Sequence, residues 1–108
     1  MKVEDIILKL KEKESKLLRR IADDLSKPAR QRREINLSRI NRFTKENEVI
    51  IVPGKVLGGG ELQHKITISA LKFSESALSK LRKNGSTVLP IEELTPESVS
   101  GKRVRIIG

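Results

Sequence analysis

The sequence predicts a mixed α/β fold, with helices at the start and alternating strands and helices afterwards. Residues 1–26 place apolar side chains at the three- and four-residue spacing of helices. Val49–Val52 is an unbroken β-branched run, which is typical of a strand buried on both faces. From residue 65 to 70 polar and apolar side chains alternate, which indicates a strand covered on one face only. One compact domain is expected, with N-terminal helices and a basic segment in residues 1–45 and a mixed strand and helix core in residues 46–108.

The N-terminal region is expected to hold two short helices or one kinked helix. Ser15 is suited to cap the second helix and Pro28 to close it, because the residue before a proline is disfavoured in helical conformation. Asn36 is expected to cap a third helix, with Ile35 and Ile40 spaced as a hydrophobic staple. This helix is expected to turn Leu37, Ile40 and Phe43 inward and to point Arg39 and Arg42 elsewhere.

Turn residues bound the remaining elements. Pro53 and Gly54 are expected to end the first strand, because proline cannot donate to a strand ladder. Ser74 can cap a later helix that Asn84 and Gly85 stop. The chain then predicts a short strand at residues 87–89, a helical turn at 91–94, the start of another helix at Thr95-Pro96 and a closing strand at 103–107.

Composition limits the partners. The 108 residues include 23 Lys and Arg against 14 Asp and Glu, a net charge of +9 that favours a polyanion such as nucleic acid. With two Phe and neither Tyr nor Trp, the chain cannot offer the aromatic platform that holds splayed single strands, so folded RNA or a duplex is the expected target. The absence of cysteine and of any long apolar run favours a cytosolic protein without a membrane partner.

Two thirds of the net charge lies in nineteen residues. Residues 27–45, here called the basic segment, hold seven Lys and Arg against one Glu, a net +6. Arginine predominates, which suits bidentate contacts to phosphate. A solvated cationic linker without a specific partner is the alternative. The candidate RNA-binding residues of this segment are Lys27, Arg30, Arg32, Arg33, Arg39, Arg42 and Lys45.

A glycine loop is the second candidate RNA contact. Lys55 begins a stretch that ends in Gly58, Gly59 and Gly60. The stretch lacks the spacing of a nucleotide-binding loop, and a strand pattern follows where a dinucleotide fold would open a helix. The loop is either a turn between strands, or a place where backbone approaches RNA because no side chain intervenes.

No catalytic or metal-binding set is recognisable. His64 is the single histidine, without cysteine or clustered carboxylates, and is expected to be an exposed polar residue beside a strand or an incidental RNA contact. The basic residues Lys80, Arg82 and Lys83 suit either the dipole of a helix end or RNA, and Arg103 and Arg105 are equally open. We therefore expect no enzyme, no cofactor, no metal and no small-molecule substrate.

A longer pattern runs through the second half of the chain at fixed spacing: Lys55, Gly58, Gly60, Leu62, Ile66, Ile68, Phe73, Ser74, Ala77, Leu81 and Gly85. It resembles the signature of the family that unites the bacterial large-subunit ribosomal protein numbered fifteen with the archaeal and eukaryotic one numbered eighteen-e. The eighteen-e branch is favoured by three further segments, residues 30–40, 52–58 and 104–107. The resemblance covers about residues 15–108.

The resemblance implies a structural protein of the large ribosomal subunit in the cytoplasm. Its partners would be large-subunit ribosomal RNA, which it would bind and stabilise, and neighbouring large-subunit proteins. The family fold is an irregular right-handed arrangement of strand-strand-helix turns. Two alternatives stay open: a DNA-binding or chromatin-like protein with residues 37–44 as a recognition helix, and an enzyme with an anion-binding glycine loop.

Overall fold

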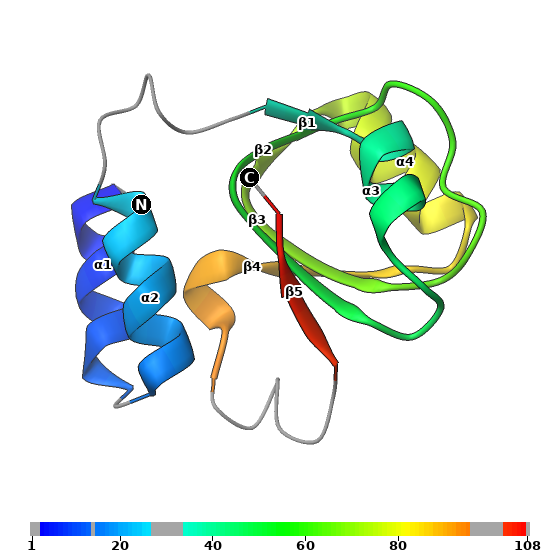
Figure 1. The fold of residues 1–108 in the computed structure, drawn as a ribbon. Coiled ribbons are helices and arrows are strands. Elements are labelled where there is room, and N and C mark those ends of the chain that lie inside the picture. Colours follow the sequence, from blue (N-terminus) through cyan, green and yellow to red (C-terminus); the bar gives the residue numbers. More distant parts are fainter. Residues whose placement is uncertain (1–2, 14, 27–33, 96–102, 108) are drawn as a thin grey trace.

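A computed structural model describes residues 3–13, 15–26, 34–95 and 103–107. Its helices and strands confirm the predicted mixed α/β class, with helices first and mixed elements afterwards (Figure 1). The elements are α1 (Val3–Glu12), α2 (Lys16–Leu25), β1 (Glu34–Asn36), α3 (Leu37–Phe43), β2 (Val49–Leu57), β3 (Thr67–Phe73), α4 (Glu75–Lys83), β4 (Thr87–Pro90), the 3-10 turn η2 (Ile91–Glu93) and β5 (Val104–Ile106). No helix among these residues is long and apolar enough to span a membrane.

All the strand pairs among the described residues are parallel. The sheet order is β1-β2-β3-β4, and β5 also pairs with β2. β3 runs along one edge of β2, while the other edge is shared: β5 pairs with Val49–Ile51 and β1 with Lys55–Leu57. β2 is therefore the central strand, and it joins β1 and the C-terminal strand β5 to the sheet.

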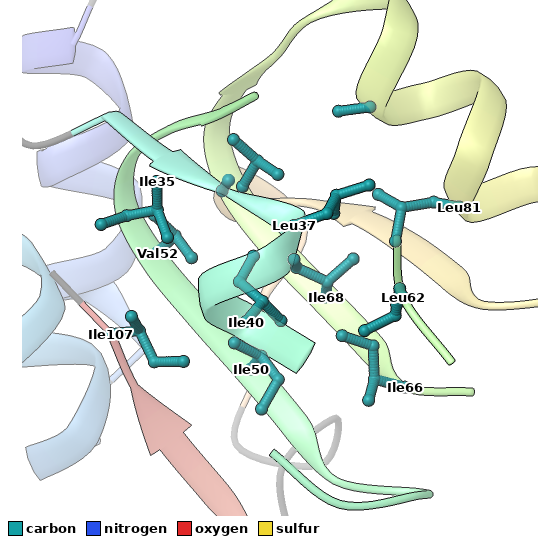
Figure 2. Close-up of a cluster of buried hydrophobic side chains, with 13 residues drawn as sticks. Ile35, Leu37, Ile40, Ile50, Val52, Leu62, Ile66, Ile68, Leu81 and Ile107 are labelled. Atoms are coloured by element: carbon teal, nitrogen blue, oxygen red, sulfur yellow. The ribbon is translucent and has the colours of Figure 1, made fainter. Parts of the chain in front are cut away.

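Helices cover both faces of this sheet, which gives the molecule three layers. α1, α2 and η2 lie together on one side, and α3 and α4 lie on the other (Figure 1). The core under α3 and α4 includes Ile50, Ile68 and Leu81, all fully buried (Figure 2). The core under α1 and α2 receives Ile51 from β2, together with Ile91 and Leu94.

The N-terminal region forms a hairpin of two helices, α1 and α2, and not one kinked helix. The Ser15 hydroxyl accepts a hydrogen bond from the Leu18 amide at 3.4 Å, which confirms its predicted capping role. Lys13, between the helices, donates its ammonium group to the carbonyls of Glu92 and Leu94. This contact fastens the hairpin to η2. The predicted closing residue Pro28 lies outside the described residues.

α3 begins after Asn36 as predicted, but Phe43 does not face inward. Leu37 and Ile40 are buried, whereas Phe43 is 51% exposed. The buried position falls instead on Thr44, whose hydroxyl donates to the Ile40 carbonyl at 2.7 Å. Residues 37, 40 and 44 follow the i, i+3, i+7 spacing of one helix face, and Phe43 lies on the neighbouring face with Arg39.

Two strand predictions are corrected. β2 does not end at Pro53 and Gly54 but continues to Leu57, and its pairing with β3 shifts register between Val52 and Lys55. This irregularity accommodates a proline that cannot donate to the ladder. β3 was expected to be covered on one face only, with its polar side chains exposed. It is covered on both faces, because Ser69 is buried like its apolar neighbours Ile68 and Ala70.

The C-terminal half otherwise follows the sequence pattern. The Ser74 hydroxyl accepts from the Ala77 amide at 3.1 Å and caps α4, and Gly85 stops the helix with a φ of 82°. The predicted strand, helical turn and closing strand are β4, η2 and β5. The predicted helix start at Thr95-Pro96 reaches beyond the described residues. β1 is an additional strand that the sequence did not indicate.

Candidate nucleic-acid interface

The described basic residues of the basic segment lie on the exposed side of α3 and just after its end. Arg39, Arg42 and Lys45 are all exposed, while Leu37 and Ile40 anchor the helix in the core. The remaining candidates of this segment, Lys27, Arg30, Arg32 and Arg33, lie outside the described residues. α3 thus holds two arginines toward solvent on a rigid support.

A shallow hollow lies between α3 and β5. It is lined by Arg39 and Phe43 on the helix and by Arg105, Ile106 and Ile107 at the C-terminal strand, and this set is called the Phe43 hollow below. An adjoining depression adds Ser38 and Arg42 and shares Arg39 and Phe43. The guanidinium carbon of Arg39 lies 5.9 Å from the centre of the Phe43 ring, within cation–π range.

A buried carboxylate holds β5 in place beside this hollow. Glu48 is 3% exposed, and its Oε2 accepts from Nε of Arg105 at 2.8 Å while Nε of Arg103 lies 3.9 Å away. Its Oε1 accepts the Lys45 amide. Burial alone would raise the pKa of Glu48. The hydrogen bonds from Arg105 and Lys45 and the two arginine charges outweigh burial and lower that pKa below its ordinary 4.5.

The lowered pKa predicts how stability depends on pH. A depressed carboxyl pKa stabilises the fold fully above pH 4.5, the value of the unfolded chain, and this contribution disappears as pH falls through the folded pKa. Glu48→Gln is therefore expected to be less stable than wild type near neutral pH, with a gap that narrows below pH 4.5.

Urea unfolding at neutral and acidic pH measures this gap. Glu46→Gln, which removes an exposed carboxylate two residues away, controls for the loss of one negative charge. A gap between wild type and Glu48→Gln that stays constant down to the most acidic buffer would contradict the assignment of this network.

The glycine loop packs tightly against the two helices of its layer. A side chain at Gly58 would meet Ser76 and the Ala77 backbone, with its Cβ 2.2 Å from the Ser76 hydroxyl oxygen. At Gly59 it would meet the Asn36 side chain. The amide of Gly59 donates to Oδ1 of Asn36 at 3.0 Å, so this Asn uses its side chain on the loop and makes no cap hydrogen bond to α3.

Lys80 braces the same loop from α4. Its ammonium group donates to the carbonyls of Gly58 and Gly60, both at 2.7 Å, and lies 3.4 Å from the Glu61 carboxylate. Lys80 lies in the last turn of α4, and its contacts with the loop are a structural role that the sequence did not indicate. Lys55 is half-buried, in register with Glu34 on β1 and Lys72 on β3.

The segment after the loop returns the chain to the start of the next parallel strand without a helix. Asn84 donates to the carbonyls of Leu62 and His64 at 3.2 and 2.9 Å, and Oδ1 of Asn41 accepts from the Gln63 amide at 2.8 Å. His64 is half-buried, not exposed as expected, and its Nε2 lies 2.7 Å from the Thr44 hydroxyl oxygen. This histidine joins the return segment to the end of α3.

The structure brings two separate sequence candidates together. The Ser38 amide at the start of α3 donates to the Gly59 carbonyl at 2.9 Å, so the glycine loop borders the helix that carries Arg39 and Arg42. Sequence reasoning missed Phe43 and Arg105 as members of the same surface. Phe43 could have been found from its i, i+4 spacing to Arg39, which places both on one helix face. Arg105 could not, because only the tertiary fold brings it to this surface.

Three layers of helix and parallel sheet, with an arginine-bearing helix at the surface, define a small basic α/β protein. A model of the family that groups the ribosomal proteins 50S-L15 and 50S-L18e with their 60S counterpart matches residues 15–89. The chain belongs to this family, which confirms the resemblance read from residues 55–85. The family is one of structural ribosomal proteins, so the expectation of a chain that is not an enzyme is also confirmed.

Curated relatives place the likeness in the eighteen-e branch. The chain is 43% identical over 105 residues to the large ribosomal subunit protein eL18 of Sulfurisphaera tokodaii, which covers 97% of this chain and 89% of that protein. It is 47% identical over 107 residues to eL18 of Methanoregula boonei, and this match covers 95% of the present chain and 88% of that protein. For eL18 of Archaeoglobus fulgidus the identity is 42% over 94 residues, with 87% and 80% covered.

Proposed function

We propose that this chain is a structural constituent of the large ribosomal subunit, located on ribosomes in the cytoplasm. There it binds and stabilises folded large-subunit ribosomal RNA and contacts neighbouring large-subunit proteins. Family membership and relatives named as large-subunit proteins support the assembly. The concentration of charge supports RNA as the bound surface, because a net +6 within residues 27–45 attracts phosphates.

The observation that carries the RNA contact is the common surface of α3 and the glycine loop. Arg39 and Arg42 extend from a helix whose apolar side is fixed in the core, so the backbone that carries them is in position before binding. Lys27, Arg30, Arg32, Arg33 and Lys45 of the basic segment are proposed to extend this surface along the RNA. The arginines then neutralise converging phosphates, each with the geometry for paired hydrogen bonds.

The glycine loop and Lys55 are proposed to complete the contact. Gly59 and Gly60 are exposed, so an RNA backbone can approach their main chain, while the space that a side chain would need is taken by Asn36 and Ser38. Lys80 and Asn36 fix the loop from within, through Gly58, Gly59 and Gly60. The loop thus presents a rigid main-chain surface beside the arginines.

Salt dependence tests this proposal. Replacing Arg39 and Arg42 together by alanine is expected to weaken binding to large-subunit ribosomal RNA of one of the related archaea. Each phosphate that the variant no longer neutralises should lower the slope of log K against log salt by roughly 0.7 to 0.9. Filter binding at several salt concentrations measures the slope.

Arg19→Ala with Arg20→Ala is the matched control, since these exposed arginines lie on α2 in the opposite layer. The control is expected to retain more of the wild-type slope than the α3 pair does. Equal slopes for wild type and the α3 variant would remove α3 from the RNA contact. Equal affinity of the wild-type protein for a DNA duplex of matched length would favour a general DNA-binding role instead.

A further inference from the structure

Phe43 is an aromatic residue whose side chain is exposed to solvent. It is 51% exposed, while the other phenylalanine of the chain, Phe73, packs against the core under α3 and α4. Leu8, on α1, is the other large apolar side chain with comparable exposure among the described residues. Phe43 differs from Leu8 in its surroundings, because it lies in a hollow and has an arginine over its ring.

The surroundings of Phe43 combine a flat apolar surface with positive charge. Ile106 and Ile107 line the Phe43 hollow with the ring, and Arg39 and Arg105 line it as well. Arg42 borders the adjoining depression. Arg105 is fixed from below by the buried carboxylate of Glu48, yet its side chain remains 42% exposed. No carboxylate is among the described residues that line either hollow.

Such a surface fits one class of ligand better than others. A nucleobase is flat and stacks on aromatic rings and on guanidinium planes, and the phosphates on either side of it match flanking arginines. A protein partner would need an apolar side chain surrounded by acidic ones to match the same charges. The hollow is therefore complementary to an unpaired nucleotide within folded RNA.

We propose that Phe43 and Arg39 form a stacking site for one unpaired base of RNA, and that Arg42 and Arg105 hold the adjacent phosphates. This inference rests on the proposed RNA-binding function and gives that function a base contact in addition to its phosphate contacts. A single ring is not the platform that follows a loose single strand. It serves one base that protrudes from a structured RNA.

The test uses two RNA hairpins of the same stem sequence, one with a single unpaired adenosine and one without. Wild-type protein is expected to prefer the bulged hairpin. Phe43→Ala should weaken binding of the bulged hairpin roughly 5- to 150-fold, the range measured for losing one stacked base. Phe43→Trp should restore the preference. As the only tryptophan of the chain, it should also lose fluorescence when the bulged hairpin binds.

Two features separate this site from a general effect of substitution. Phe43→Ala should leave the salt slope of binding unchanged, because phenylalanine neutralises no phosphate. Leu8→Ala, which shortens the other exposed apolar side chain, should bind both hairpins as wild type does. Circular dichroism with a thermal melt checks that each variant is folded.

Each other outcome decides against the stacking site. If wild type binds both hairpins equally, or Phe43→Ala keeps the preference, the stacking site is wrong while phosphate binding can still hold. If wild type binds neither the hairpins nor ribosomal RNA in a salt-dependent way, the proposed function itself fails. If Phe43→Ala binds RNA normally but no longer enters large subunits, the ring contacts a neighbouring protein instead.

Discussion

Gly60→Ala is expected to destabilise the fold by about 2–5 kcal/mol, of which a non-glycine residue in left-handed conformation accounts for about 1–2 and overpacking for about 1–3. Gly60 has a φ of 80°, and an added Cβ would lie 2.4 Å from the Cβ of Ser38 and 3.1 Å from its Cα. The Ser38 backbone cannot move aside without displacing the start of α3. Urea unfolding of the isolated protein measures the loss.

Gly85→Ala is the matched control for this substitution. Gly85 has nearly the same φ, 82°, but an added Cβ would meet the flexible end of the Lys65 side chain, at 3.1 Å from Cε. Only the conformational cost of about 1–2 kcal/mol is then expected. If Gly60→Ala cost no more than Gly85→Ala, the loop would not be packed against α3 as described. A Gly60→Ala variant as stable as wild type would contradict the left-handed conformation of Gly60.

Ile68→Ala is expected to cost about 2–5 kcal/mol, because it deletes a fully buried side chain and leaves a cavity. Ile68 is the second residue of β3, with Ile50 of β2 and Val88 of β4 as its neighbours in register. The Ile68 side chain lies within the core under α3 and α4 (Figure 2). The alanine side chain leaves this buried volume unfilled.

Val88→Ala tests the same register position at the edge of the sheet. Val88 is only partly buried, so its truncation is expected to cost about 1 kcal/mol, close to the transfer value for the carbons removed. Equilibrium unfolding of both variants under one set of conditions gives the comparison. Equal losses would contradict the described sheet order, in which β3 is an interior strand and β4 is at the edge.

Local signals in the sequence predicted the helices and their ends well. Ser15 and Ser74 act as caps and Gly85 as a stop, because these roles depend on neighbouring backbone groups within a few residues. The continuous β-branched run predicted the burial of β2 on both faces for a similar reason. Where the determinants are local, sequence patterns are sufficient.

Predictions failed where contacts distant in the sequence decide the structure. Ser69 is buried because a second layer of helices covers that face, and Pro53 stays within β2 because the pairing with β3 shifts to admit it. β1 has three residues, too few to show a period, and exists because the chain pairs with Lys55–Leu57. The strand-strand-helix arrangement was implied by the family resemblance and not by periodicity, and the parallel pairing of the strands was not predicted.

The candidate site shows the same division. Charge density indicated α3, and Arg39 and Arg42 are exposed there as expected. The glycines suggested a close approach by RNA, and the structure supplies an additional reason for them in their contacts with Ser38, Asn36 and Ser76. Arg105 joins the same surface only through the pairing of β5 with β2.

We propose that RNA contacts at α3 and the glycine loop hold this chain in the large ribosomal subunit. Sedimentation of ribosomal subunits tests it most directly, with tagged wild type and the variant in which Arg39 and Arg42 are both alanine expressed in a related archaeon. Wild type is expected to travel with the large subunit, and the variant to shift toward the top of the gradient as salt is raised. A wild-type protein that stays at the top of the gradient at low salt would contradict the account.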